Sequence, residues 1–154
     1  MLMLLFWVKE EPWAIAATDI ESLLPLVALQ PVQGKLHNPA LTGWINCHGS
    51  MIPAIDLSKQ VADAPAPLQL STRIAVVTLP LSPRRIGLIL ERAGEMADLN
   101  NPVDLPTQSF YTQALFKDSG GAVVQRLAIA PLFELAFRPV NQTDVDLQMQ
   151  SVSK

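Results

Sequence analysis

The distribution of proline is the feature that most constrains this chain. Thirteen prolines occur along its 154 residues, whereas average usage is about 5%. Because proline lacks a backbone N–H and its ring clashes with the preceding helical turn, each one excludes a helix interior. A bundle of long helices is therefore impossible. The segments between the prolines are short apolar runs separated by turn-forming residues, a pattern typical of an all-β domain.

The expected elements follow from these runs. The sequence predicts strands at 4–8, 13–17, 42–47, 51–57, 72–79, 85–92, 95–99, 110–117 and 121–127. Segment 19–24 fits either a helical turn or an irregular strand. One helical turn is expected at 58–61, and a closing helix at 129–137 that includes Pro131 in its first turn, where proline is tolerated. Loops are expected at 34–39, 63–70 and 100–108. Residues 141–154 lack large apolar side chains at a useful period and are expected to be a disordered tail.

Composition bounds the size and class of the protein. Apolar residues make up 49% of the chain and charged residues only 16%, against about 25% charged in typical domains. The length suits one domain, or two small joined ones, with a core that needs no disulfide or metal. Disorder of the bulk of the chain is excluded. The surplus of apolar over charged residues predicts that some apolar surface stays outside the fold and is available to partners.

Charge and cysteine content exclude several kinds of partner. A net charge of −3 gives no attraction to phosphate, so nucleic acid is not expected as a partner. Cys47 is the single cysteine, which rules out an internal disulfide framework and fits a reducing cytosol. The apolar start at 1–8 has no basic residue before it and stops at Lys9, so we interpret it as a buried strand and not as a secretory signal. No apolar run approaches 20 residues, so membrane insertion is not expected.

Catalytic residues are few. Cys47 and His48 are adjacent, but neighbours in a strand point to opposite faces and cannot form a nucleophile–base pair directly. A metal site would need His37, His48 and Asp56 to converge, and their spacing carries little signal. Asp56 precedes a short helical turn and is expected to cap it. Gly49 lies where a tight hairpin needs a positive φ. The residues alone predict a small β domain without catalysis, cofactor or metal.

One stretch is more specific. Residues 43–57 read GWINCHGSMIPAIDL and resemble the central signature of the CheW-like domain family. That signature runs Gly-hydrophobic-hydrophobic-Asn-hydrophobic-Arg-Gly, followed by a short strand that reaches Pro-x-x-Asp-Leu. The matching positions are Gly43, Asn46, Gly49, Pro53, Asp56 and Leu57. The order of the family's other strands and of its closing helix is matched by segments 4–26, 71–79, 85–96 and 120–135. The resemblance therefore covers residues 3–138.

The resemblance implies a fold and a role. The fold is two packed SH3-like β-barrel subdomains with one or two short helices. The role is a non-catalytic adaptor in the cytoplasm that couples the cytoplasmic tip of a chemoreceptor to a CheA-type histidine kinase, whose regulatory domain it binds. Such an adaptor is recruited to receptor clusters at the membrane. Segments 24–31 and 70–74 look most similar to adaptors of Wsp-type surface-sensing pathways.

The resemblance also implies which residues contact partners. The family's contact positions correspond here to Ile20, Ser22, Gly43, Asn46, His48, Gly49 and Gly87. For Gly43 and Gly87 a purely structural role in close packing is the stronger reading, whereas His48 is expected at an exposed hairpin tip. Two positions depart from the family pattern. His48 stands where the family has arginine, a permanently charged donor fork, and Leu127 is followed by Ala128 and not by aspartate.

Two other classes of function remain open from the sequence. One is a ligand-binding or sensory β-barrel, which would show a buried cavity with convergent polar groups. The other is an enzyme built on Cys47, His48 or Asp56, which would need these groups within reach of one another.

Overall fold

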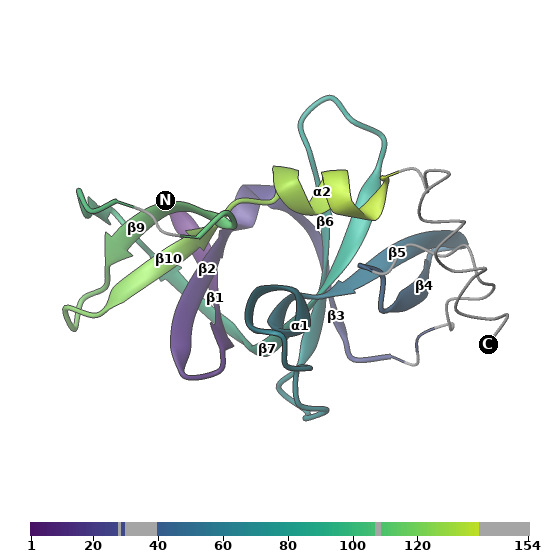
Figure 1. Ribbon diagram of the computed structural model, residues 1–154, viewed down its shortest axis with the longest axis horizontal. Helices are drawn as coiled ribbons and strands as arrows, with labels where there is room; N and C mark the ends of the chain where they lie inside the picture. Colours follow the sequence, from purple (N-terminus) through teal and green to yellow (C-terminus); the bar gives the residue numbers. More distant parts are fainter. Residues whose placement is uncertain (28, 30–39, 107–108, 139–154) are drawn as a thin grey trace, which may run out of the picture.

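The fold is built mainly from β-strands. The computed structural model describes residues 1–27, 29, 40–106 and 109–138, and Figure 1 shows their arrangement. In chain order the elements are β1 Leu2–Val8, β2 Glu11–Ala16, the 3₁₀ turn η1 Ala17–Asp19, β3 Ile20–Pro25, β4 Gly43–Cys47, β5 Ser50–Asp56, α1 Leu57–Ala62, β6 Arg73–Thr78, β7 Arg85–Asp98, β8 Asn101–Pro102, β9 Thr112–Lys117, β10 Val123–Leu127 and α2 Ala130–Ala136. The expected mainly β class with short helices is confirmed.

Strand β7 joins two halves of the molecule. The strand order is β3-β6-β7-β1-β2-β10-β9-β8, with β5 also paired to β7 and β4 paired to β5. The first part of β7 pairs with β5 and β6, and its later part pairs with β1. We call β3–β6 with the start of β7 the second subdomain, and β1, β2 and β8–β10 with the end of β7 the first subdomain. The two lie side by side in Figure 1, with α1 and α2 between them.

The expected break between strands at 85–92 and 95–99 is wrong, because β7 runs unbroken from Arg85 to Asp98. Near the expected break, Arg92 has a positive φ of 50°, and the register against β1 shifts between Leu5 and Trp7. Such a bulge bends a strand and increases its twist without ending it. The bend lets one strand serve both subdomains. The expected loop at 100–108 also begins with the two-residue strand β8.

The other local predictions mostly agree with the structure. Hairpins form where turn residues predicted them, between β1 and β2, β4 and β5, β6 and β7, and β9 and β10. Segment 19–24 is the end of a 3₁₀ turn followed by strand β3, so both expected forms occur in succession. Helix α2 has Pro131 in its first turn. The loop expected at 34–39 and the tail at 141–154 lie outside the described residues.

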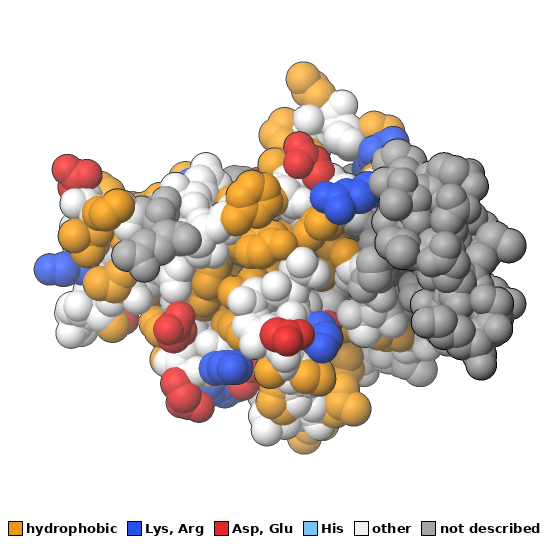
Figure 2. All heavy atoms as spheres, in the orientation of Figure 1, with side chains coloured by type: hydrophobic (Ala, Val, Ile, Leu, Met, Phe, Trp, Pro, Cys, Tyr) orange, Lys and Arg blue, Asp and Glu red, His pale blue; other side chains and the backbone are white. Residues whose placement is uncertain are grey.

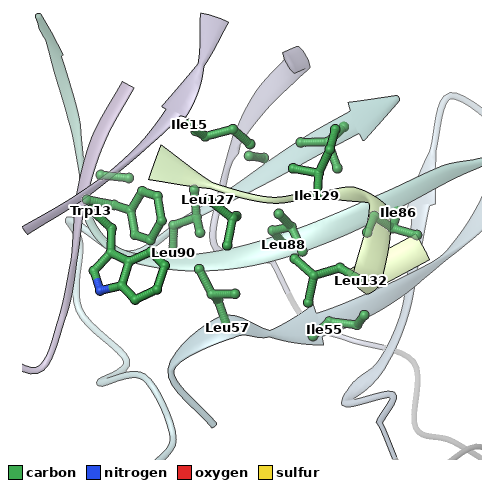
Figure 3. Packing of buried hydrophobic residues seen from close by; sticks show 14 of the residues in the cluster. Trp13, Ile15, Ile55, Leu57, Ile86, Leu88, Leu90, Leu127, Ile129 and Leu132 are labelled. Carbon is green, nitrogen blue, oxygen red and sulfur yellow. The ribbon is translucent and has the colours of Figure 1, made fainter. Parts of the chain in front are cut away.

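Three apolar clusters hold the subdomains together. The central core lies between them and takes side chains from both, including Trp13 of β2, Leu88 of β7, Leu57 of α1 and Leu132 of α2. Figure 3 shows these side chains pointing toward one another. A second core, which includes Ile74, fills the second subdomain. A smaller one fills the first.

Alternation along the strands explains how one sheet serves two cores. Successive side chains of a strand point to opposite faces. On β7, Ile86 and Leu88 therefore contribute to the central core, while Ile89 contributes to the second core. Burying one such side chain stabilises the fold by about 1.5–3 kcal/mol. In the described part of the chain, no helix is long and apolar enough to cross a membrane.

Candidate partner-binding surface

Three of the predicted contact residues lie in one row across the second subdomain. Ser22 of β3 is opposite Val76 of β6, and Val76 is opposite Gly87 of β7. Gly87 is in turn in register with Ala54 of β5, which is opposite Gly43 of β4. Directly opposed residues share a face of the sheet. Val76 and Ala54 belong to the second core, so this row faces the interior of the second subdomain.

Gly87 occupies the crowded middle of this row. A Cβ atom at this position would lie 2.9 Å from Cδ1 of Ile45 and 3.2 Å from Cγ2 of Ile74. Both of these isoleucines are fully buried, so they have little room to move away. Gly43, at the end of the row, is also buried. Close packing therefore accounts for Gly87, and direct contact of either glycine with a partner stays a prediction.

Ile20 and Ser22 lie on β3 but face different cores. Ile20 is opposite Val77 and packs against the central core, whereas Ser22 is opposite Val76, in the row described above. The two residues are separated by one position and would normally share a face. A register shift between them changes the face. Both are half-buried, so each leaves only part of its side chain to a partner.

The β4–β5 hairpin carries the three exposed predicted residues. Asn46, His48 and Gly49 are all exposed, with the last two forming the turn. His48 has a φ of 52° and Gly49 a φ of 87°. Positive φ at both central positions defines a type I′ turn, whose twist matches that of the strands it joins. The expected positive φ at Gly49 is confirmed, and His48 is at the tip as expected.

Asn46 fixes this tip. Its side-chain Oδ1 accepts a hydrogen bond from the backbone N–H of Gly49 at 2.9 Å. The residue directly opposite Asn46 is Met51, whose side chain is 48% exposed. Met51 was not among the contact residues predicted from the sequence. The signal was present, because Met51 and Ile52 are consecutive apolar residues in a strand, and only one of them can face the core.

The enzyme alternative depends on groups that the structure does not bring together. Cys47 is 3% exposed within the second core, whereas His48 is exposed at the hairpin tip. Asp56 caps α1 as expected, with its Oδ1 accepting from the Lys59 N–H at 3.2 Å. Its Oδ2 accepts from the Ala66 N–H at 3.0 Å. Each oxygen of the Asp56 carboxylate thus holds a backbone amide.

A metal site at His37, His48 and Asp56 is not formed from the residues that can be placed. His37 lies outside the described residues. Among the described ones, no group of three or more His, Cys, Asp or Glu side chains is arranged to hold a metal ion. The alternative of a ligand-binding barrel would need an internal cavity. The interior of the second subdomain is instead filled by the packed side chains of Ile45, Ile52, Ile74, Val76 and Ile89.

Electrostatic contacts tie β3 to its surroundings. Glu21, on the outer face of β3, pairs with Arg85 of β7 at 3.0 Å. Just before β3, partial burial raises the pKa of Asp19 above its ordinary value of 3.8, and the positive charge of Arg126 opposes that rise. The start of β3 is thus held to β7 by an ion pair.

Large apolar side chains also reach the surface. The most exposed of these among the described residues are Leu68, Leu70, Leu81 and Phe110. On the face drawn in Figure 2, hydrophobic side chains also gather in the middle of the molecule, between the two subdomains. The surplus of apolar residues in the composition is therefore partly at the surface, where it is available to partners.

Comparisons with known proteins agree with this architecture. The family model of the CheW-like domain matches residues 2–136, a span that includes both subdomains. Among solved structures, the chain is similar to the crystal structure of the scaffolding protein TtCheW from Thermoanaerobacter tengcongensis. The TM-score is 0.71 at 20% sequence identity, over 86% of this chain and 87% of that one. No curated protein is a significant match to the sequence. The extent of the family match shows that the chain belongs to the CheW-like domain family.

Proposed function

We propose that this protein is a non-catalytic adaptor that couples a chemoreceptor to a CheA-type histidine kinase in a chemotaxis-type pathway. The family match over both subdomains is the observation that carries the proposal. The solved relative TtCheW is a scaffolding protein, which supports a role in assembly and not in chemistry. The contacts of Asp56 and the burial of Cys47 favour structural roles for these two residues, in agreement with that role.

The proposed partners are the regulatory domain of the kinase and the cytoplasmic tip of the receptor. The exposed tip of the β4–β5 hairpin, with Asn46, His48 and Gly49, is the part of the predicted contact set most available to a partner. Ile20 and Ser22 on β3 add a second, half-buried contact. His48 replaces the family's arginine. We therefore expect the side chain at this position to reach less far and to make a weaker polar contact with a partner.

Residues 3–138 are proposed to be the working unit, located in the cytoplasm and recruited to receptor clusters. We propose that residues 141–154 are not required for folding, because their sequence offers little apolar surface to offset the entropy of ordering. Assignment to a Wsp-type pathway depends on segments 24–31 and 70–74, the first of which lies partly outside the described residues. That assignment stays a prediction.

The proposal is tested by calorimetric titration. The purified protein is titrated with the isolated regulatory domain of the organism's CheA-type kinase. Signalling contacts of modest area typically bind weakly, so we expect saturable binding with a micromolar Kd. The matched control is the Gly94→Ala variant, at an exposed position outside the predicted contact set, which should bind like the wild type. Absence of binding at several hundred micromolar kinase domain would contradict the proposal.

A further inference from the structure

We propose that a groove beside α2 is a docking site for an acidic segment of a partner protein that carries a large apolar side chain. The α2 groove lies between α2 and the loop joining β6 to β7 and has a volume of about 340 Å³. Its lining is Leu79, Ser82, Arg84, Ala130, Phe133, Glu134, Phe137 and Arg138. None of the predicted contact residues of the adaptor lines it, so this inference does not rest on the proposed function.

The floor of the α2 groove is apolar and fixed in place. Phe133 is buried in the central core, and Leu79 and Phe137 pack against that core. The rings of Phe133 and Phe137 are stacked, with centroids 6.3 Å apart. Because the floor is part of the packed interior, an apolar side chain entering the groove meets a preformed surface. Little ordering of the floor is then needed on binding.

Two arginines that have no acidic partner among the described residues line the α2 groove. The guanidinium carbon of Arg84 lies 4.6 Å from the centre of the Phe137 ring, and Arg138 follows the end of α2 and is exposed. The ion pairs among the described residues include Arg85 with Glu21 but neither of these two arginines. Figure 2 shows basic side chains beside α2, near one acidic group. Glu134 is the one carboxylate in the lining, so the groove attracts anions although the chain as a whole has a charge of −3.

Leu81 stands at the tip of the loop next to the groove. Its side chain is fully exposed, and its φ is 61°. The N–H of Ser82 donates to the carbonyl of Leu79 at 3.3 Å, which closes a turn with Pro80 and Leu81 at its centre. Proline followed by a residue with positive φ is typical of a type II turn, where glycine or asparagine is preferred. Leucine is bulky and is strained in this conformation.

Leucine is therefore an unfavourable residue at this turn position for two reasons. A polar or glycine residue would relieve the strain and remove an exposed apolar side chain. Strained residues persist where their conformation has a use. On this proposal Leu81 is retained because it contacts the docked partner beside the groove, where the loop residues Leu79 and Ser82 line it.

These features define the chemistry of the partner. Carboxylates of an acidic segment form charge-assisted, bidentate hydrogen bonds with the guanidinium groups of Arg84 and Arg138. An apolar side chain between the carboxylates lies against Phe133 and Phe137 in the groove, and Leu81 contacts the segment where it leaves the groove. A free inorganic anion would use the arginines and leave the apolar surfaces exposed to water. The combination of both surfaces thus favours a peptide segment.

Selection of a phage-displayed random dodecapeptide library on the full-length protein tests this inference. We expect the enriched peptides to carry a net negative charge and at least one large apolar residue. Binding of a selected, fluorescein-labelled peptide should weaken at least tenfold in the Arg84→Gln/Arg138→Gln double variant. The matched control is Arg92→Gln, because Arg92 also lies over an aromatic ring, 4.8 Å from the centre of Trp7, but in the first subdomain. The control should bind the peptide within twofold of wild type.

A second variant separates docking from folding. Leu81→Asn should leave the Tm unchanged or raise it, because asparagine tolerates positive φ, and should weaken peptide binding at least threefold. Selection without acidic bias, equal binding to the double variant, or full binding to Leu81→Asn would each overturn the inference. Complete displacement of the peptide by low millimolar inorganic phosphate would show that the arginines bind anions only, which would also overturn it.

Discussion

The Asn46 side chain holds the backbone of Gly49 through a 2.9 Å hydrogen bond between Oδ1 and the amide N–H. Both residues belong to the predicted contact set, and both also build the hairpin that presents His48. Substitutions at the tip therefore change the scaffold as well as the surface. Experiments on partner binding have to separate these two effects.

Asn46→Ala is expected to destabilise the protein by about 1 kcal/mol, because the Gly49 N–H loses its acceptor at the closed tip. Asn46→Asp keeps an acceptor oxygen at the same place and should recover most of the loss. Urea denaturation followed by tryptophan fluorescence measures both. Equal stability of Asn46→Ala and wild type would show that the hydrogen bond contributes nothing and that Asn46 is free to serve a partner alone.

His48→Arg restores the family residue and is expected to leave folding unchanged to within about 0.5 kcal/mol, because the site is exposed. The added permanent charge and donor fork should alter the Kd for kinase domain or receptor fragment by roughly threefold or more, the scale of an exposed ion pair. Calorimetric titration of the variant against both partners measures this. Unchanged affinity for both would remove His48 from the contact set.

Gly49→Val is the contrasting substitution at the neighbouring position. Gly49 has a φ of 87°, and a β-branched residue is strongly disfavoured there. We expect a loss of about 1–3 kcal/mol in stability, measured by urea denaturation, whereas His48→Arg at the adjacent position should leave stability unchanged. A fully stable Gly49→Val variant would mean that the tip changes its turn type.

Gly87→Ala tests the row across the second subdomain. The new Cβ would lie 2.9 Å from Cδ1 of Ile45, so overpacking should destabilise the protein by about 1–3 kcal/mol. Ile45→Val removes that Cδ1 atom, and in its background the cost of Gly87→Ala should fall. A double-mutant cycle from thermal or chemical unfolding measures the coupling.

Gly94→Ala is the control on the same strand. A Cβ at Gly94 meets nothing within 4 Å, and its φ is not positive. This substitution should be neutral or slightly stabilising, because alanine restricts the unfolded chain. If Gly87→Ala is as mild as Gly94→Ala, close packing does not explain Gly87, and contact with a partner becomes the better explanation.

Asp19 carries a pH prediction. Burial raises the pKa of Asp19 above 3.8, and Arg126 opposes the rise. When the pKa of a carboxyl is higher in the folded than in the unfolded protein, its ionisation opposes folding. Its contribution to stability should therefore fall as the pH rises from below 3.8 through the folded pKa. Asp19→Asn should flatten this part of the stability profile, and Arg126→Gln should raise the pKa of Asp19 further. NMR titration of the Asp19 carboxyl carbon measures the pKa directly, and a value at or below 3.8 would contradict the account.

Local features of the fold were predictable from sequence. Turn residues at Lys9, at His48–Gly49 and at 118–121 mark hairpins that the structure contains. The cap at Asp56 followed from its place before a short helical run. These predictions succeeded because each depends on interactions between residues that are close in the chain.

Features that depend on distant residues were not predictable. The row from Ser22 through Gly87 to Gly43 needs the register of four strand pairs, and no local pattern sets that register. The predicted break in the strand near Arg92 was wrong for the same reason. The later half of β7 is defined by its pairing with β1, which no local pattern indicates. The strained position of Leu81 was hidden because leucine gives no signal for positive φ.

The most direct test of the adaptor account measures coupling. Receptor cytoplasmic fragments in ordered arrays, the organism's CheA-type kinase and this protein are mixed, and kinase autophosphorylation is followed with radiolabelled ATP. The account predicts that kinase activity responds to receptor only when this protein is present, and that the response saturates with its concentration. Receptor-dependent kinase activity that is the same with and without the protein would contradict the account.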